Sequence, residues 1–556
     1  MPFTNGRRDI IPGMRLSRCL LALLFTPALS AQTEIRVDAA ARQGPFPPIF
    51  EWFGYDEPNY TYTANGKKLL AELAALSPVR VSVRTHHLLV TGDGTGAMKW
   101  GSTNAYTEDA DGKPVYDWTI VDRIFDTYMQ LNIRPFVEIG FMPEALSSQP
   151  EPYARNWPNT PEGRGWAQPP KDYQKWAELV RQWVLHAVSR YGKSEVETWQ
   201  WELWNEPDIF YWRGTPEEYD KLYDVTAAAI RRALPTAKVG GPATTNPNST
   251  QAGAFLRQFL DHVAHSGAPL DFISYHDKGA PRVVDGHLRM GIRPNLMNVQ
   301  KGIEIVKQFP QFEDLPIVLS ESDPEGCAAC PLAGHPEVGY RNNTIYPAYT
   351  AVMLNNILKL ADRYHANIQG MLTWAFEFED KKYFEGFRTL STNGIDKPIL
   401  NLFRMAGLMR GDRVPLTSSG ASGLDQILQS GVTGSPDIDG FATRSDREVA
   451  VMLWNYHDDD TPAPQAPVQL SVAGLPASGR VLVQHYRIDD QHSNSYTLWQ
   501  TIGSPQKITT EQHSALEAAG QLQLLQSPEW VTIRNGTLQL EFSLPRQSVS
   551  LLTFHW

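Results

Sequence analysis

The 556-residue sequence predicts an α/β fold, a (β/α)8 TIM barrel with a C-terminal β-sandwich domain. The first observation is a series of eight short apolar segments between residues 50 and 376, each about as long as a strand. The second is that amphipathic helical patterns separate nearly all of these segments. The third is a change after residue 400, where strand-like runs follow one another with only turn residues between them.

The expected barrel strands end on one face, because right-handed crossovers between parallel strands leave every C-terminal end on the same side. They are Ile49 to Gly54, Val79 to Arg84, Pro135 to Ile139, Thr198 to Trp204, Lys238 to Gly241, Asp271 to His276, Pro316 to Ser320 and Ile368 to Trp374. Barrels of this kind carry their active sites on that face.

Two of the intervening helices have clear end signals. Apolar residues recur at helical spacing from Tyr173 to Tyr191, and Gly192 follows, so we expect an amphipathic helix that ends at this glycine. The segment Thr215-Pro216-Glu217-Glu218 has the N-cap threonine, the first-turn proline and the capping glutamate of a helix that ends near Pro235.

We assign residues 32–400 to the barrel and residues 401–556 to the β-sandwich. The expected sandwich strands are Glu448 to Trp454, Val468 to Val472, Arg480 to Arg487, Trp530 to Arg534 and Ser548 to Phe554. Glu34 to Val37 is a candidate for one more strand, so that residues 32–45 could belong to the sandwich rather than to the barrel.

Residues 1–31 have the pattern of a secretory signal peptide. Arg15 and Arg18 precede an apolar run from Cys19 to Phe25, and small residues suit cleavage near residue 30 or 31. This run is too short to span a bilayer, and no other segment approaches eighteen consecutive apolar residues. We therefore expect a secreted or periplasmic protein that is not in the membrane in its mature form. Whether translation starts at Met1 or Met14 stays open.

Charge and cysteine content restrict the partners and the redox chemistry. The net charge of −11, without a basic stripe, argues against a nucleic acid partner, whereas an uncharged polymer would not be repelled. Loss of the signal leaves Cys327 and Cys330, which we expect to form a disulfide in an exported protein. A zinc site is the weaker interpretation of this pair, because no second ligand pair follows at finger spacing. The oligomeric state is not indicated.

Ionisable side chains gather at the expected strand ends. They are Asp56, Glu57, Arg84, His86, Glu138, Glu206, His276, Glu321 and Glu377, with Asn205 and Trp374 among them. A barrel collects these positions in one pocket, and structural ion pairs would not require so many charges there. Asp56, Glu57 and Glu377 keep the simpler interpretation of ion-pair partners or helix caps.

Two of these carboxylates suit the cleavage of a glycosidic bond. Glu206 ends the fourth strand segment in Trp204-Asn205-Glu206-Pro207, and Glu321 follows the seventh strand directly. Retaining glycosidases use an acid and a nucleophile about 5–5.5 Å apart, and strands four and seven can face each other across a barrel at such a distance. Asp323, Glu325 and Glu377 remain alternatives to Glu321 as the nucleophile.

With these residues the chain resembles glycoside hydrolase family 39, the family of β-xylosidases and α-L-iduronidase. The resemblance covers roughly residues 50 to 400. Its further motifs are Arg84-Thr85-His86, Pro114-Val115-Tyr116-Asp117-Trp118, residues 134–143, Gly214-Thr215-Pro216-Glu217-Glu218-Tyr219, Trp374-Ala375-Phe376 and Gly394-Ile395-Asp396-Lys397-Pro398. The chain departs from the family pattern at Ser320-Glu321-Ser322 and at Tyr275-His276-Asp277-Lys278, where Lys278 would add a positive charge near the pocket.

The resemblance implies that Glu206 is the acid/base, Glu321 the nucleophile, and His86, Asn205 and His276 sugar-binding residues. We also expect Arg84, Glu138, Tyr340 and Trp374 to contribute to substrate binding. Several alternatives stay open: Glu138 could instead orient Arg84, the two histidines could be satisfied core residues, and the aromatic residues Tyr211, Trp212 and Tyr340 could form either a sugar platform or part of the core.

The resulting hypothesis is a secreted retaining β-xylosidase that acts on oligosaccharides from the chain end by double displacement, without a metal or organic cofactor. One alternative is a glycosidase of the same fold that releases another pentose, a uronic acid or a disaccharide. A second alternative is a non-catalytic carbohydrate-binding protein, against which the presence of both carboxylates argues.

Overall fold

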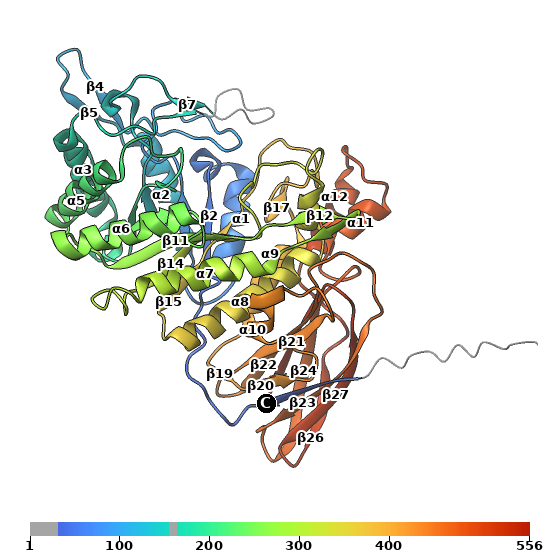
Figure 1. Ribbon diagram of the computed structural model, residues 1–556. Coiled ribbons are helices and arrows are strands. Elements are labelled where there is room, and N and C mark those ends of the chain that lie inside the picture. Colours follow the sequence, from blue (N-terminus) through green and yellow to red (C-terminus); the bar gives the residue numbers. More distant parts are fainter. Residues whose placement is uncertain (1–31, 155–163) are drawn as a thin grey trace, which may run out of the picture. The chain divides into compact units, whose positions relative to one another are not determined.

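The computed structural model describes residues 32–154 and 164–556, so the predicted signal peptide lies outside the described residues. A ring of parallel strands forms the first domain (Figure 1). Its strands are β2 (Trp52–Tyr55), β3 (Ser82–Thr85), β6 (Arg134–Ile139), β9 (Gln200–Leu203), β10 (Lys238–Thr244), β11 (Phe272–Lys278), β14 (Ile317–Asp323), β15 (Ile368–Met371) and β16 (Thr373–Trp374). β15 pairs with β14 and β16 with β2, which closes the barrel with one interrupted strand in the eighth position.

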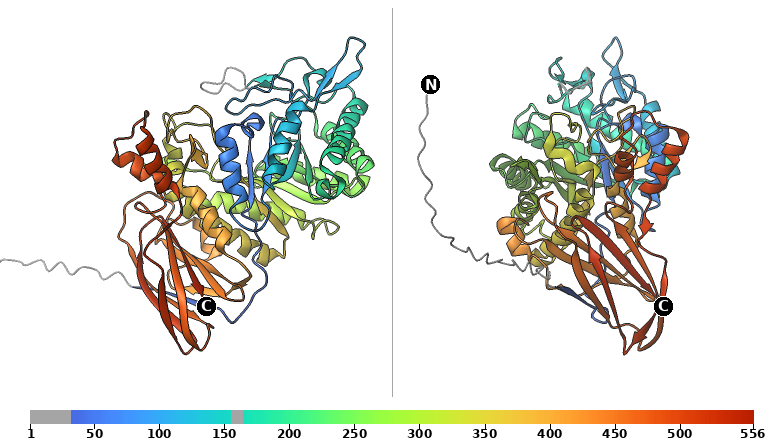
Figure 2. Two further views of the ribbon diagram at one scale, coloured as in Figure 1. Left: turned by 180° about the vertical axis from the view of Figure 1, so that it is seen from behind. Right: turned by 90° about the vertical axis from the view of Figure 1, so that its right-hand side faces the viewer.

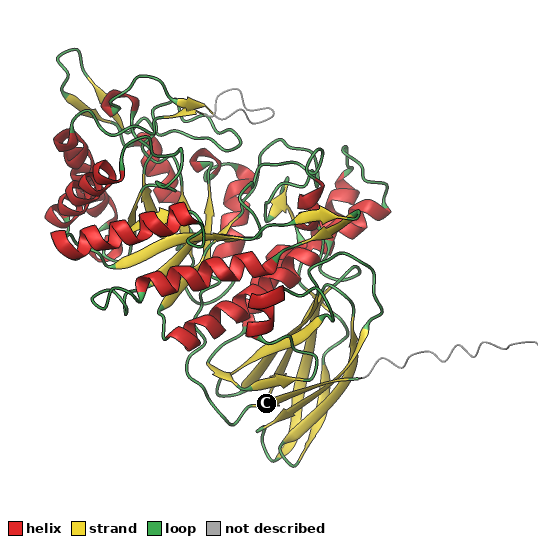
Figure 3. Ribbon diagram, in the orientation of Figure 1, coloured by secondary structure: helices red, strands yellow, loops and turns green. Residues whose placement is uncertain are grey.

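Helices alternate with these strands and cover the outside of the ring (Figure 3). They are α1 (Ala64–Ala74), α2 (Thr119–Gln130), α3 (Tyr173–Tyr191), α5 (Pro216–Ala233), α6 (Thr250–Ser266), α7 (Ile292–Val306), α8 (Ile345–Tyr364) and α9 (Pro398–Leu408). The predicted stripe of α3 is buried and its C-cap is Gly192 with φ +88°, a value that suits glycine. The capping box of Thr215 and Glu218 begins α5. The (β/α)8 fold class is therefore confirmed.

Short elements decorate the loops of the barrel. They are η1 (Pro58–Tyr60), β4 (Tyr106–Glu108), β5 (Pro114–Tyr116), η2 (Glu144–Leu146), β7 (Tyr153–Ala154), β8 (Arg164–Gly165), α4 (Lys193–Val196), β12 (Arg282–Val284), β13 (His287–Arg289), η3 (Pro336–Asn342), β17 (Ser391–Thr392) and β18 (Ile395–Asp396). Eight of these strands form four small antiparallel pairs, β4 with β5, β7 with β8, β12 with β13 and β17 with β18.

Large aromatic rings fill the interior of the barrel. Trp52, Phe136, Phe272 and Trp374 belong to one buried cluster, in which Trp52 meets Phe136 edge-on at 5.5 Å. Glycines on neighbouring strands make this possible, since a Cβ at Gly370 would lie only 2.6 Å from the Trp52 ring. The charged side chains at the strand ends therefore lie above a dry aromatic layer.

The second domain is one long sheet that folds over itself into two layers. Its strands are β19 (Asp412–Val414), β20 (Leu416–Ser418), β21 (Asp437–Arg444), β22 (Glu448–Tyr456), β23 (Ala466–Ala473), β24 (Ser478–Ile488), β25 (Gln523–Leu524), β26 (Glu529–Arg534), β27 (Thr537–Leu544), β28 (Ser548–His555) and the N-terminal β1 (Thr33–Asp38). Figure 2 shows β1, drawn in blue, among the strands of this domain. β1 pairs in parallel with β23 and antiparallel with β20, so the candidate strand at Glu34 to Val37 is part of this sheet.

One layer of this sheet is buried on both faces. The inner face of β22 contributes Val449, Val451 and Leu453 to the sandwich core, whereas Trp454 on its other face belongs to the core of the barrel. β22 and β28 accordingly contact α8. Because both faces of β22 are apolar, the run from Glu448 to Trp454 lacked polar alternation in the sequence.

Several elements of this region were not expected from the sequence. They are β19, β20, β21, β25, β27 and the helices α10 (Leu424–Ser430), α11 (Ser495–Thr501) and α12 (Thr510–Gly520). β21 contains Asp437, Asp439 and Gly440, residue types that are rare in strands. Asp437 is tolerated because the Trp454 indole donates to its carboxylate at 2.7 Å. Among the helices of residues 32–154 and 164–556, none has the length and apolarity needed to cross a membrane.

Candidate active site

The C-terminal ends of the barrel strands surround a cavity of about 560 Å³. It collects side chains from seven different strand ends and the loops that follow them. The described residues that line it include Asp56, His86, Lys99, Asn205, Glu206, Thr245, Asn246, Lys278, Glu321 and Trp374. Both carboxylates that the sequence analysis selected, Glu206 and Glu321, therefore open into the same space.

A tight turn after β9 aims Glu206 into this cavity. The backbone takes left-handed φ values at Trp204 (+69°) and Glu206 (+45°), which are unfavourable for most residues other than glycine and asparagine. Two bonds hold the turn: the Trp204 indole donates to the Tyr211 carbonyl at 2.9 Å, and the Glu206 amide donates to the Ala243 carbonyl at 2.9 Å. Burial of the Trp204 ring thus supports a strained acid position.

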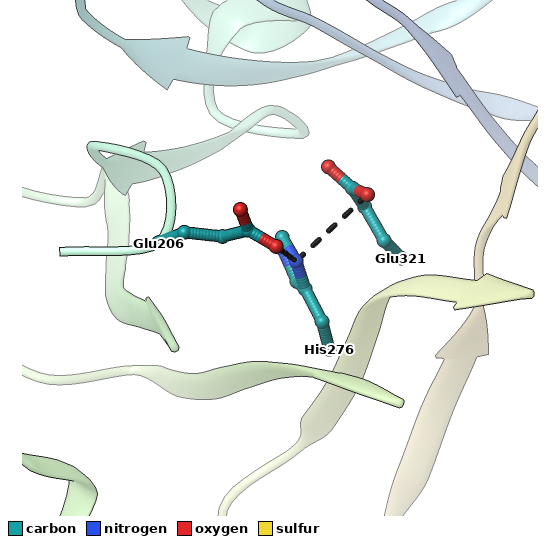
Figure 4. Close-up of side chains that lie close together, drawn as sticks. All are labelled: Glu206, His276 and Glu321. Atoms are coloured by element: carbon teal, nitrogen blue, oxygen red, sulfur yellow. Dashed lines mark hydrogen bonds and ion pairs between the residues drawn. The ribbon is translucent and has the colours of Figure 1, made fainter. Parts of the chain in front are cut away.

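His276 stands between the two carboxylates (Figure 4). Its Nδ1 lies 3.0 Å from Oε1 of Glu206 and 3.8 Å from Oε2 of Glu321. One oxygen of each carboxylate lies within 4.8 Å of the other carboxylate's oxygen and of the imidazole. This separation is close to the spacing of about 5–5.5 Å in retaining glycosidases and shorter than the 6.5–9.5 Å of inverting ones.

Cations surround Glu321. Lys278 Nζ donates to its Oε2 at 2.8 Å, and Arg84 Nη1 donates to its Oε1 at 3.3 Å, with Nε2 of His86 at 3.5 Å from the same oxygen. Burial opposes ionisation of Glu321, but the charges of Lys278, His276 and His86 outweigh burial and hold its pKa well below the usual range. Glu321 is therefore ionised at neutral pH, as a nucleophile must be.

Arg84 and Glu138 lie beneath the cavity and not in its wall. The Arg84 side chain is fully buried and pairs with Glu202 at 2.5 Å and with Glu138 at 3.3 Å, while donating to Oδ1 of Asn205 at 3.2 Å. Glu138 is equally buried. This geometry fits the alternative in which Glu138 orients Arg84, and it places Arg84 between Asn205 and Glu321. A direct contact of either residue with substrate stays a prediction.

His86 is held as a cation. Its Nε2 lies 2.9 Å from Glu138, and its Nδ1 lies 3.0 Å from Asp56, whose other oxygen accepts from the Trp374 indole at 2.8 Å. Burial opposes protonation, but Glu138 and Asp56 outweigh it and raise the pKa of His86 to about 10. His86, Asn205 and Trp374 all line the cavity, so they are placed where a sugar could contact them.

Two further residues do not line the cavity. His276 has no exposed surface and lies 3.0 Å from Glu206, which fits the alternative of a buried histidine, and its contact with a sugar stays a prediction. Tyr340 lies in η3, fully buried and edge-on to Tyr346, outside the residues that line the cavity. Tyr340 is thus part of the core, which was one of the two alternatives for the aromatic residues. Tyr211 lines the cavity, whereas Trp212 does not.

The three alternative nucleophiles are buried in other ion pairs or hydrogen bonds. Asp323 pairs with Lys278 at 2.6 Å and Glu325 with Arg341 at 2.7 Å. Glu377 accepts from Ser391 and from the Asn393 amide, and its burial raises its pKa to about 7. None of the three lines the described part of the cavity, which favours Glu321.

Sequence reasoning missed Glu202 and Lys99. Glu202 stands in β9 between Trp201 and Leu203, and the alternation of a charge with apolar residues was a signal that it points into the barrel. Lys99 pairs with Asp56 from a loop that follows β3. Its segment has no periodic pattern, so no sequence signal could have placed it.

The cysteine pair lies at the edge of the cavity. Cys327 and Cys330 form a disulfide, and Cys327 lines the cavity. Arg341 donates to the carbonyls of Cys327, Ala328 and Cys330. The loop after β14 is thus fastened to a buried arginine, which fixes the wall beside Glu321.

Glu206, His276 and Glu321 have the donor types of a metal site. However, Glu321 already faces the Lys278 ammonium and the Arg84 guanidinium, and these charges would repel a bound cation. The arrangement suits an acid and a nucleophile better than a metal, so we assign no metal to it.

The model of the glycosyl hydrolases family 39 matches residues 83–526. A β-xylosidase of Caldicellulosiruptor saccharolyticus is 27% identical over 455 residues, covering 80% of this chain and 84% of the relative. An α-L-iduronidase of Mus musculus is 25% identical over 568 residues, covering 96% and 81%. The crystal structure of a monomeric β-xylosidase from Caulobacter crescentus CB15 has the same fold, with a TM-score of 0.75 at 23% identity over 94% of this chain and 99% of that one. The chain therefore belongs to glycosyl hydrolases family 39 and is a glycoside hydrolase.

Proposed function

We propose that the protein is a secreted, retaining β-xylosidase that removes single xylose units from the end of xylo-oligosaccharides. The observation that carries the mechanism is the short separation of the two carboxylates, whose oxygens lie within 4.8 Å. A gap of this size admits an anomeric carbon but leaves no room for the water that an inverting enzyme places between its carboxylates.

In the first step, an oxygen of Glu321 attacks the anomeric carbon while Glu206 donates its proton to the departing glycosidic oxygen. The bond between anomeric carbon and oxygen breaks, and a glycosyl ester of Glu321 forms. Lys278 and Arg84 hold the Glu321 carboxylate ionised and aimed before the attack. Asn205 lines the cavity beside the acid, where its amide can bind the 2-hydroxyl of the sugar.

In the second step, Glu206 accepts a proton from a water molecule, which attacks the anomeric carbon and releases Glu321. The same carboxyl group thus acts first as acid and then as base. His276 supports both states, because its Nδ1 lies 3.0 Å from Glu206 and 3.8 Å from Glu321. Two inversions at one carbon return the original configuration.

A neutral sugar suits the charge of the cavity. The described residues that line it bring three cations, His86, Lys99 and Lys278, and three carboxylates, Asp56, Glu206 and Glu321. The charges balance when both catalytic groups are ionised, and each lysine faces a carboxylate at short range. Two bacterial relatives named β-xylosidase agree with a neutral pentose as substrate.

One observation favours a uronic acid as the second candidate. When Glu206 is protonated for its acid role, the lining residues carry one positive charge in excess, and Lys278 and Lys99 both reach the cavity. A sugar carboxylate could meet this charge. The α-L-iduronidase relatives are consistent with that alternative.

Export is part of the proposal and rests on residues 1–31. Two arginines, an apolar run and small residues follow one another there in the order of a signal peptide. The disulfide of Cys327 and Cys330 agrees with an oxidising compartment. N-terminal sequencing of protein recovered outside the cytoplasm tests the proposal. Exported protein that still contains residue 20, within the apolar run of the signal, would contradict it.

Hydrolysis of a panel of aryl glycosides tests the activity. We expect the β-xyloside to be cleaved with retention, seen as β-xylose formed first in the proton NMR spectrum, and the matched iduronide and arabinoside to be cleaved far more slowly. Glu321→Ala should abolish turnover of every substrate. Faster cleavage of the iduronide would select the second candidate, and α-xylose as first product would reject double displacement.

A further inference from the structure

A second cavity of about 590 Å³ lies beside the catalytic one and shares part of its wall. Ile209 and Phe210 line both, and these residues belong to the loop between β9 and α5. Glu206 stands at the start of this loop and is the group that protonates the leaving oxygen. The second cavity therefore adjoins the side of the site on which the leaving group departs.

The lining of this second cavity suits a sugar ring. Phe210 is 52% exposed and presents the main aromatic face, while the largely buried Trp212 and Phe255 form part of the wall behind it. Gln251, an exposed residue of α6, lies at the rim, where its Nε2 already donates to the Asp208 carbonyl and its amide oxygen can accept from a sugar hydroxyl. Aromatic faces pack against the C–H groups of a pyranose, while amides bind its hydroxyls. Among the described lining residues Asp208 carries the only ionisable group, and its carboxylate already accepts from Thr245.

We propose that this cavity is a subsite for a further sugar ring in the leaving portion of an oligosaccharide. The inference rests on the proposed function and adds a chain-length preference to it. With the scissile sugar between Glu206 and Glu321, the chain passes over Phe210 toward α6. Substrates of three or more units then gain contacts that a disaccharide lacks.

Ala254 offers a way to fill the subsite without touching the catalytic cavity. It is an exposed residue of α6 that lines the second cavity but not the catalytic one. Ala254→Trp should fill the space that a sugar ring would occupy. The matched control is Ala264→Trp, an exposed position on the same helix that lines neither cavity.

The experiment compares kcat/KM for xylotetraose with that for β-xylosyl fluoride, whose leaving group contains no ring. We expect Ala254→Trp to lower the value for the tetraose at least about tenfold and to leave the fluoride within about twofold. Ala264→Trp should match the wild type on both. Equal losses on both substrates, or no loss on the tetraose, would overturn the subsite.

Two other outcomes are informative. If Ala254→Trp slows only glycosides with a bulky apolar aglycone, the occupant is such an aglycone and the sugar subsite is wrong. If the wild type cleaves neither xyloside, the proposed function fails, and the subsite fails with it. If the wild type is active and Ala254→Trp is as active as the wild type on both substrates, only the subsite fails.

A separate observation concerns the β-sandwich, which reaches the active site through a helix end. α7 begins after Gly291 without a side-chain cap of its own. Asp458, two residues after β22 of the sandwich, accepts from the Ile292 amide at 3.3 Å through Oδ1, and its carbonyl accepts from the Met290 amide at 2.7 Å. The same carboxylate is held in place by the Tyr456 hydroxyl at 2.7 Å and the Val432 amide at 2.9 Å. A residue of the second domain thus caps a barrel helix.

Buried side chains of α7 connect this cap to the catalytic rim. Asn298 donates to the carbonyl of Lys278 at 2.9 Å, and Asn295 donates to Asp277 at 2.6 Å. Asp277 also accepts from Ser322, the residue after Glu321, at 2.8 Å. The end of β11 and the end of β14 are therefore held by the helix that Asp458 caps.

The geometry points to Asp458 as a positioning residue for Lys278 and hence for the nucleophile. Asp458→Ala should lower kcat about tenfold or more, because the ammonium loses its placement beside Glu321, and should move the acidic limb of the kcat/KM profile to higher pH. Asp458→Asn keeps an oxygen for the Ile292 amide but places an amide group against the Val432 N–H, so it should retain more activity than Asp458→Ala but less than the wild type. A loss of stability in Asp458→Ala with an unmoved acidic limb and an unchanged kcat would overturn the inference.

Discussion

Lys278 Nζ lies 2.8 Å from Oε2 of Glu321 and 2.6 Å from Oδ2 of Asp323. Burial opposes the charged form of Lys278, but the two carboxylates outweigh it and raise its pKa above the ordinary value. Glu321, the proposed nucleophile, therefore shares one cation with a second, fully buried carboxylate. Lys278 thus ties the reactivity of Glu321 to the electrostatics of the strand ends.

Replacement of Lys278 by methionine should move the pH at which activity is lost. Glu321 must be ionised, and its pKa lies well below the usual range, so wild-type activity persists until the pH falls through that low value. Without the ammonium the pKa of Glu321 rises and the loss begins at higher pH. We expect kcat to fall about a hundredfold as well.

The pH profile of kcat/KM for an aryl β-xyloside checks this prediction. Lys301→Met, which removes a half-exposed lysine of α7 paired with Glu304, is the control and should keep the wild-type profile. An acidic limb at the same pH in Lys278→Met would show that other groups set the ionisation of Glu321.

Glu206→Ala should slow substrates with a poorly acidic leaving group far more than substrates with an acidic one. An alkoxide needs the proton of Glu206, so cleavage of xylobiose should fall by about three orders of magnitude. A dinitrophenolate leaves without protonation, so formation of the glycosyl ester from that xyloside should be nearly normal, and its hydrolysis should become limiting. Stopped-flow absorbance should record a burst of phenolate. Glu217→Ala, at an exposed glutamate of α5, should show neither effect.

The charge of His86 should make the free energy of unfolding decrease as the pH rises into the alkaline range. Its pKa is raised to about 10 in the folded protein from the ordinary value of 6.5 for histidine. The contribution of the charged imidazole is complete below pH 6.5 and is lost as the pH rises through about 10. We expect His86→Gln to lower the free energy of unfolding by about 3 kcal/mol at pH 6.

Urea denaturation of both proteins at pH 6 and pH 10 measures this difference. The gap between wild type and His86→Gln should narrow at the higher pH, because the wild type then loses the charge that the variant lacks. A gap that is constant across this range would mean that His86 is neutral in the folded protein.

Arg84 should be essential for stability as well as for activity. It is fully buried and faces Glu138, Glu202 and Glu321, so Arg84→Met leaves three carboxylates without their shared cation. We expect a loss of about 3–5 kcal/mol in the free energy of unfolding. Arg84→Lys keeps the charge but cannot span three partners. Its free energy of unfolding, measured by chemical denaturation, should therefore lie between those of Arg84→Met and the wild type. Equal stability of Arg84→Met and wild type would contradict the buried network.

Local patterns were sufficient for much of this molecule. The apolar segments and helical spacings located all eight barrel strands, the end of α3 at Gly192 and the start of α5 at Thr215. Glu206 and Glu321 were selected because each follows a predicted strand; in the structure Glu206 lies in the turn after β9, and Glu321 lies within the C-terminal part of β14. Such features depend on neighbours in the sequence, so they can be read from it.

Tertiary structure decided the roles of the groups that several strands share. Arg84, Glu138 and His276 stood at strand ends like true wall residues, yet the packed barrel buries them under the cavity. β21, with its aspartates and glycine, became a strand because Trp454 and the adjacent strands satisfy it. The capping of α7 by Asp458 joins residues 166 positions apart. Distances and burial of this kind arise when distant segments meet, and charge pairing across them depends on the closed barrel and not on any local pattern.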